Sequence, residues 1–155
     1  RENYIYAKLN KDLNNLNNII LENVCLSNTN NKQNMVTHVN NVPNGGSSTI
    51  INSLFEKIKK KNIKIEEVRS IKLDDYLNLD SNSISIIQLD VEGHETEVIE
   101  GAIKTIKKNK PIIIIESKPK KYIENILFEL GYSYHNKKLH ANFILFINNY
   151  HTLSF

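Results

Sequence analysis

The sequence predicts an α/β fold in which a parallel sheet is layered with helices and followed by an antiparallel hairpin. Two observations predict this class. Strand-like and helix-like apolar patterns alternate through the second half of the chain, and two strand-like segments joined by a short connection end it. The 155 residues suffice for one domain with a sizeable core, so we expect a single domain over residues 1–155.

The first half of the chain predicts one helix and two strands. In residues 2–16, apolar side chains recur at intervals of three and four, which is typical of an amphipathic helix. Residues 19–26 are largely β-branched or apolar and are bounded by Asn and Ser, which favours a strand. A second short strand is predicted at residues 35–39, before a Pro-Asn-Gly-Gly turn.

The middle of the chain continues the alternation. Residues 51–58 carry a helical apolar stripe that ends in a run of lysines, and residues 63–73 return to strand-like composition. Asp74 and Asp75 then start a short helix or turn. Residues 84–91 form a nearly continuous apolar run, as expected for a parallel strand that is covered on both faces.

The last third predicts two βα units and the hairpin. From Glu95 onward a helical stripe follows the strand at residues 84–91, and Pro111 stops this helix before a strand at residues 112–115. A further helix covers residues 122–130, with Gly131 at its C-terminal cap. The hairpin strands are predicted at residues 132–135 and 141–147.

Composition narrows the function classes. The formal net charge is +3, with lysines gathered at the expected helix ends, and the chain has no Trp and only Arg1 and Arg69 as arginines, which argues against a nucleic-acid partner. No apolar run approaches the roughly 20 residues that span a bilayer, so no membrane partner is expected. The single Cys25 and the absence of a signal-peptide pattern favour a soluble protein in the cytoplasm.

Acidic residues are concentrated around one Gly-His pair. Asp90, Glu92 and Glu116 follow predicted strands, and ligands of open α/β sheets bind beyond the carboxyl ends of strands. Glu95 and Glu97 lie in the first turn of the following helix, where the helix dipole favours them. Gly93 falls at the sharp turn between strand and helix and permits either a positive φ or a close approach to a ligand. These residues are the candidate site.

A metal site is an alternative interpretation of this cluster. Asp90, Glu92 and His94 supply three ligand types within five residues, which is the basis for a metal-dependent hydrolase as the least favoured hypothesis. The second histidine of a His-Glu-x-x-His motif is missing, and alternate residues of a strand point to opposite faces. We therefore assign no metal ligands. Cys25 lies in an apolar strand without a His partner, which argues against a thiol nucleophile.

Three blocks in order, "VRSIKLDDYL", "LDVEGHETEVIEGA" and "KPIIIIES", resemble the FkbM family of S-adenosylmethionine-dependent methyltransferases. Further similarity extends to "ENYIYAKLNKDLNNLNNIILENVCLSN" and "LGYSYHNKKLHANFILF", so the resemblance covers almost the whole chain. It implies a seven-stranded, Rossmann-like class I sheet with the strand order third, second, first, fourth, fifth, seventh, sixth. It also implies methyl transfer from S-adenosylmethionine, usually to an oxygen of a sugar, polyketide or other metabolite.

The resemblance also implies roles for individual residues. Asp90 would adjoin the transferred methyl group, with Glu92 and Gly93 immediately behind it, and Ser27 and Asn28 would lie toward the adenine side. The candidate catalytic residues are thus Asp90 and Glu92. The candidate cofactor-binding residues are Ser27, Asn28, Asp90 and Gly93.

The sequence departs from the family pattern at its start. The family's first strand with its Gly-rich loop and its second acidic-ended strand do not occur in this sequence. We therefore expect the first βαβ portion to be missing, with the part after Glu66 keeping its packing and residues 1–48 docking poorly or pairing differently. Whether the chain is active alone stays open, and the alternative is a non-catalytic Rossmann-like remnant or binding module.

Overall fold

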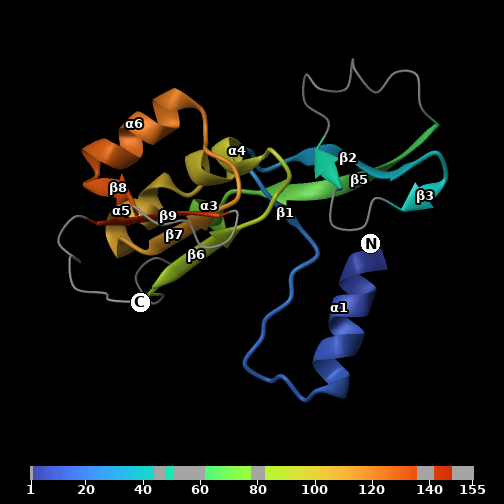
Figure 1. The fold of residues 1–155 in the computed structure, drawn as a ribbon. Helices are drawn as coiled ribbons and strands as arrows, with labels where there is room; N and C mark the ends of the chain where they lie inside the picture. The colour runs from blue at the N-terminus through green and yellow to red at the C-terminus, as the bar shows by residue number, and fades with distance from the viewer. Residues whose placement is uncertain (1, 44–47, 51–61, 78–82, 136–141, 148–155) are drawn as a thin grey trace. The chain divides into compact units, whose positions relative to one another are not determined.

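Figure 1 shows the computed structural model, which describes residues 2–43, 48–50, 62–77, 83–135 and 142–147. The chain divides into two compact units, which are described separately. Unit 1 consists of Arg1–Cys25 and Asn31–Ser70, and unit 2 consists of Leu26–Asn30 and Ile71–Phe155. The helix expected at residues 51–58 lies outside the described residues, and the single domain stays a prediction.

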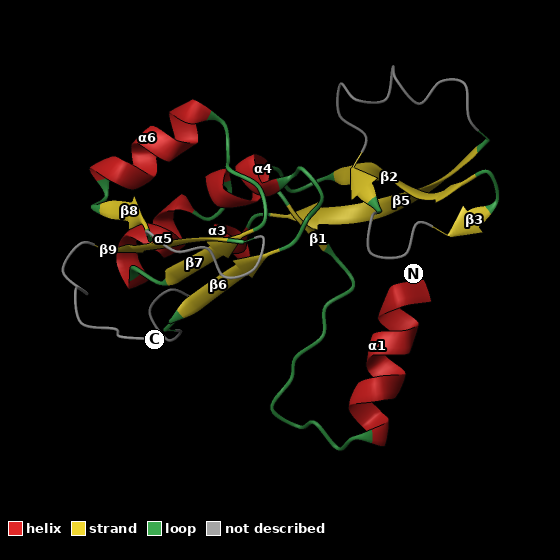
Figure 2. Ribbon diagram, in the orientation of Figure 1, coloured by secondary structure: helices red, strands yellow, loops and turns green. Residues whose placement is uncertain are grey.

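The sheet of unit 1 is built around a long antiparallel pair. β2 (Lys32–Val39) pairs with β5 (Ile63–Ile71) along most of its length, and also with the short strands β3 (Val42–Pro43) and β4 (Thr49–Ile50). The two-residue strand β1 (Cys25–Leu26) lies beside β5 at one edge of the sheet, in the strand order β1-β5-β2-β3 (Figure 2). The strands expected at residues 35–39 and 63–73 are confirmed as β2 and β5, and they form an antiparallel sheet rather than βα units.

Helix α1 (Glu2–Leu13) confirms the helix expected at the start of the chain, but it buries no residue. Its apolar stripe is exposed, with Leu9 at 52% and Leu13 at 70%. The strand expected at residues 19–26 is reduced to β1, and Ile20 is 82% exposed. β-branched composition favours a strand only where a neighbouring strand and a packed face support it.

Unit 2 contains a four-stranded mixed sheet with the order β6-β7-β9-β8. Strands β6 (Ile86–Leu89) and β7 (Ile112–Ile115) are parallel, whereas β9 (Phe143–Ile147) is antiparallel to both β7 and β8 (Tyr132–Tyr134). The expected βα order and terminal hairpin are confirmed, and the protein is α/β. The resemblance implied this same order for the last four strands.

The described residues of unit 2 include four helices, and the main difference from the expectation is a break in one of them. The stripe expected to form one helix after Glu95 is interrupted at Gly101, giving α4 (Glu95–Glu100) and α5 (Ile103–Asn109). The short helix expected at Asp74 is α3 (Leu73–Tyr76), and the last is α6 (Lys121–Glu129). Among the described residues, no helix combines the length and apolar character needed to cross a membrane.

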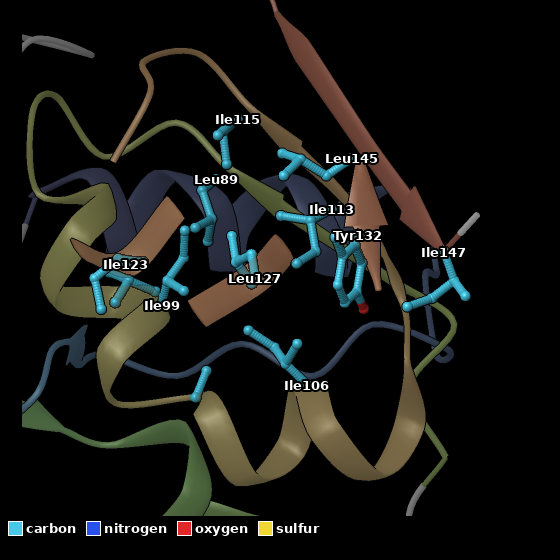
Figure 3. Close-up of a cluster of buried hydrophobic side chains, with 12 residues drawn as sticks. Leu89, Ile99, Ile106, Ile113, Ile115, Ile123, Leu127, Tyr132, Leu145 and Ile147 are labelled. Carbon is cyan, nitrogen blue, oxygen red and sulfur yellow. The ribbon is translucent and has the colours of Figure 1, made fainter. Parts of the chain in front are cut away.

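One hydrophobic cluster joins the helices to one face of the sheet. Alternate strand residues such as Ile113, Ile115 and Leu145 are fully buried in it, together with Ile99 and Ile106 of the helices (Figure 3). Since α4, α5 and α6 all contribute to this cluster, they cover the same face. On the opposite face Ile86 is 57% exposed, so the expectation that this strand is covered on both faces is wrong at Ile86.

Candidate functional site

Three carboxylates gather where the parallel strands of unit 2 end. Leu89 and Ile115 are partners in the β6–β7 register, so the residues that follow them, Asp90 and Glu116, emerge side by side. With Glu92 they offer oxygens that all lie within 4.8 Å of one another, open to solvent. We call Asp90, Glu92 and Glu116 the acidic rim. The expectation that strand ends would bring these three together is confirmed.

Within the acidic rim, the protonation of Glu116 depends on its neighbours. The negative charge of Asp90 and a hydrogen bond with it raise the pKa of Glu116, with smaller contributions from desolvation, Glu92 and Glu95. Like charges this close disfavour full ionisation, which is why the shift is upward. The acidic rim can therefore accept a proton or a hydrogen bond, or attract a positive group.

The backbone turns sharply just after the first rim residue. Glu92 has a φ of 50° and Gly93 a φ of 86°, both in the left-handed region. A Cβ on Gly93 would meet no described atom within 4 Å, so conformation rather than close packing requires glycine there. Of the two expectations for Gly93, the positive φ is confirmed.

The turn sends His94 in the opposite direction from the acidic rim. His94 is 3% exposed, and its Nε2 lies 3.1 Å from Oγ of Ser27. Its Nδ1 lies 3.5 Å from Oε2 of Glu97. Burial lowers the pKa of His94, although the charges of Glu97 and Glu95 oppose this effect. His94 is thus neutral near pH 7 and does not join Asp90 and Glu92 in a metal-ligand set, because it contacts Ser27 instead.

The loop after β1, residues 27–30, is fixed to α4 and α3 by side-chain contacts. The Ser27 N–H donates to the carbonyl of Ile71 at 2.9 Å. Asn28 Nδ2 donates to Oε2 of Glu100 at 2.7 Å, and Asn30 Nδ2 to Oδ2 of Asp75 at 2.6 Å. Ser27 is 1% exposed, whereas Asn28 is half-buried. Asn28 is therefore the member of the predicted cofactor pair whose side chain reaches the surface.

Gly101 explains why the loop can lie so close to the helices. A Cβ built there would fall 2.0 Å from the carbonyl oxygen of Ser27, which is backbone and cannot rotate away. The same glycine marks the interruption between α4 and α5. Sequence reasoning missed this role, because an isolated glycine in a helical pattern gives no indication of which distant segment approaches it.

Glu95 and Glu97 were expected only to interact favourably with the helix dipole, but both side chains are largely removed from solvent. Glu95 is 3% exposed, and its Oε1 has no hydrogen-bond partner among the described residues. Glu97 lies near both His94 and Lys120, whose Nζ is 3.5 Å from Oε1 of Glu97. Glu97 does not mainly face solvent, since its side chain is 19% exposed.

Ser27, His94 and Glu97 follow the order of a hydroxyl–imidazole–carboxylate relay, as in acyl-transfer enzymes. A nucleophile of that kind must reach its substrate, and Ser27 is buried at 1% exposure with its hydroxyl directed to His94. The arrangement therefore fixes the loop after β1 and does not constitute a hydrolase site. The hydroxyl–imidazole contact was not foreseeable from local sequence, because it joins residues 67 positions apart.

The carboxylates lie beyond the carboxyl ends of adjacent parallel strands, where α/β sheets bind their ligands. The family model described as the methyltransferase FkbM domain matches residues 2–150. The chain belongs to the FkbM methyltransferase family, as the resemblance implied. No curated protein and no solved structure matches the chain.

Proposed function

We propose that this protein transfers a methyl group from S-adenosylmethionine to an oxygen of a small-molecule acceptor, such as a sugar, polyketide or other metabolite. The observation that carries the proposal is the acidic rim beyond the parallel strands β6 and β7. Membership of the FkbM methyltransferase family supports methyl transfer as the reaction class.

The side chains of this site have the chemistry needed to bind S-adenosylmethionine. Carboxylates accept hydrogen bonds from hydroxyl and ammonium groups and attract a positive centre, and Asn28 of the same unit offers a partly exposed side-chain amide. When bound, S-adenosylmethionine supplies an electrophilic methyl group on a positively charged sulfur. We assign Asn28, the loop backbone at Ser27, Gly93 and Asp90 to cofactor binding.

The acidic rim orients the acceptor and receives its proton. Asp90 and Glu92 accept hydrogen bonds from the acceptor's hydroxyl groups and hold the reacting oxygen in place, which lowers the entropy cost of reaching the transition state. With the cofactor bound, the acceptor oxygen would gain a bond to the methyl carbon as the carbon–sulfur bond breaks and leaves its electron pair on sulfur. A rim carboxylate would receive the proton of the acceptor hydroxyl. The neighbouring Glu116, whose pKa is raised by Asp90, is suited to share that proton.

Calorimetric titration with S-adenosylmethionine, followed by mass spectrometry of candidate acceptors, tests the proposal. We expect saturable binding and a mass increase of one methyl group on a hydroxylated acceptor. Binding should persist after chelation, because the proposal uses no metal ion. Absence of any S-adenosylmethionine binding would favour the non-catalytic remnant over the enzyme.

A further inference from the structure

Three independent contacts hold the loop after β1 against α4 and its C-terminal end. His94 Nε2 meets Ser27 Oγ at 3.1 Å, and Asn28 donates to Glu100 at 2.7 Å. The Ser27 carbonyl packs so closely on Gly101 that no side chain would fit there. Two of these contacts are polar, and that of His94 is fully buried. Such a buried contact constrains the loop more than an exposed one, because water cannot replace the lost partner.

His94 belongs to the same short turn as the acidic rim. The left-handed conformations of Glu92 and Gly93 reverse the chain between exposed Asp90 and buried His94. A displacement of His94 is therefore transmitted to a turn that also carries two rim carboxylates. The hydrogen bond to Ser27 connects that turn with the loop that carries Asn28.

Electrostatics indicate the direction of this hydrogen bond. His94 Nδ1 faces the Glu97 carboxylate at 3.5 Å, so a proton on Nδ1 is favoured over a lone pair that would face a negative charge. Nε2 then carries the lone pair and accepts a hydrogen bond from the Ser27 hydroxyl, whose Oγ also lies 3.4 Å from Oδ1 of Asn28. The charged groups that act on His94 are Glu97, Glu95 and Lys120. Protonation of Nε2 would leave it unable to accept, and the bond with Ser27 would have to reorganise.

We propose that His94 is a positioning residue that fixes the loop after β1 through Ser27 and thereby sets the affinity for the cofactor. The inference rests on the proposed function, because it takes Asn28 and the backbone at Ser27 as cofactor contacts. It assigns to His94 neither contact with the acceptor nor proton transfer. Its effect should accordingly appear in cofactor binding rather than in the chemical step.

Substitutions at both ends of the hydrogen bond test this assignment in the full chain. His94→Leu and Ser27→Ala should each weaken S-adenosylmethionine binding about threefold to tenfold, the loss of one buried hydrogen bond, while kcat changes little. His94→Gln, which can place an acceptor near the position of Nε2, should recover most of the affinity. The protein with both substitutions should bind S-adenosylmethionine no more weakly than the single variant that binds it less tightly. The reason is that each substitution removes the same hydrogen bond.

Thr105→Val is the matched control. Thr105 of α5 is fully buried, and its Oγ1 donates a hydrogen bond to Oδ1 of Asp74 in α3 at 2.8 Å. This variant therefore also loses one buried hydroxyl contact. It should lower thermal stability without changing cofactor affinity. Equal weakening of binding by Thr105→Val and Ser27→Ala would show a general structural effect and overturn the assignment. Ser27→Ala keeps the test decisive if His94→Leu fails to fold.

A pH series and hydrogen exchange separate this inference from the proposed function. Cofactor affinity of the unsubstituted protein should fall at acidic pH as His94 gains a proton, and the fall should be reduced in His94→Gln. The amides of residues 27–30 should exchange faster in His94→Leu than in the unsubstituted protein, with or without cofactor. Faster exchange with unchanged affinity would overturn the inference while leaving the proposed function intact. A chain that never binds S-adenosylmethionine would overturn both.

Discussion

At the scale of single residues, the main feature of the candidate site is the short distance between the carboxylates of Asp90 and Glu116. Asp90 and Glu116 are exposed, yet the parallel register of the strands before them keeps their side chains together. Their mutual repulsion opposes folding when both are ionised. Groups whose pKa is perturbed by a close charge cluster at functional sites, which supports a role in binding or chemistry for this pair.

We expect Asp90→Asn to reduce methyl transfer by roughly 10²–10⁴-fold, the range for removal of a positioned proton acceptor. Glu129→Gln in α6 is the control, since Glu129 is exposed and belongs to no part of the acidic rim. Glu97 is unsuitable as a control because it lies near His94 and Lys120. Steady-state methyl transfer on an identified acceptor measures the effect. Equal losses in the two variants would remove Asp90 from the catalytic assignment.

Glu116→Gln should stabilise the protein near neutral pH. The folded pKa of Glu116 is raised, so the folded state holds this proton more tightly than the unfolded state does. Stability is therefore lost as pH rises through the interval between the two pKa values. Below about pH 4 the carboxyl is protonated in both states, and the difference between variant and parent should vanish. Melting temperatures across pH measure this, and a less stable variant at pH 7 would contradict it.

At the scale of elements, the βα units of unit 2 were predictable and the sheet of unit 1 was not. Apolar periodicity is a local property, and it identified β7, α6 and the terminal hairpin with small errors at their ends. The pairing of β2 with β5 depends on residues far apart in sequence, which local patterns do not encode. The break at Gly101 and the burial of Ser27 by His94 are likewise set by packing between distant segments.

Helix α5 depends on a cap supplied by another element. Its own preceding residue, Ala102, has no capping side chain, and the Asp74 carboxylate of α3 accepts the N–H groups of Lys104 and Thr105 at 3.0 and 2.8 Å. Asp74→Ala should therefore destabilise the protein by about 1–2 kcal/mol, the cost of losing a helix cap. Urea denaturation measures it, with Asp12→Ala in exposed α1 as the control. If the Asp74→Ala variant were as stable as the Asp12→Ala control, Asp74 would not be the cap of α5.

At the scale of the whole molecule, the two units differ in how well their elements are supported. Unit 2 has one cluster that joins three helices to a sheet, and its central strand β7 has side chains at 0% exposure. In unit 1, α1 buries none of its residues. Helices of about 12 residues are marginal in water without a packed face. Local stability should therefore differ strongly along the chain.

Amide hydrogen exchange should reveal this gradient. We expect the amides of α1 to exchange at rates close to those of an unstructured peptide and those of β7 to exchange most slowly, with β2 and β5 between them. The antiparallel pairing of β2 with β5 provides the internal comparison within unit 1. Protection of α1 equal to that of β7 would mean that α1 has a covering surface in solution.

The hydrogen bond between Ser27 and His94 also has a consequence for the order of folding. Its two residues are 67 positions apart, whereas strand partners in the sheet of unit 2 lie closer in sequence, for example Ile86 with Ile112 and Ile113 with Leu145. Long loops close more slowly and at a greater entropy cost than short ones. After dilution from denaturant, the core around β7 should gain protection first and residues 27–30 last. The newly folded protein would then hold a complete core for a short time before it could retain a ligand.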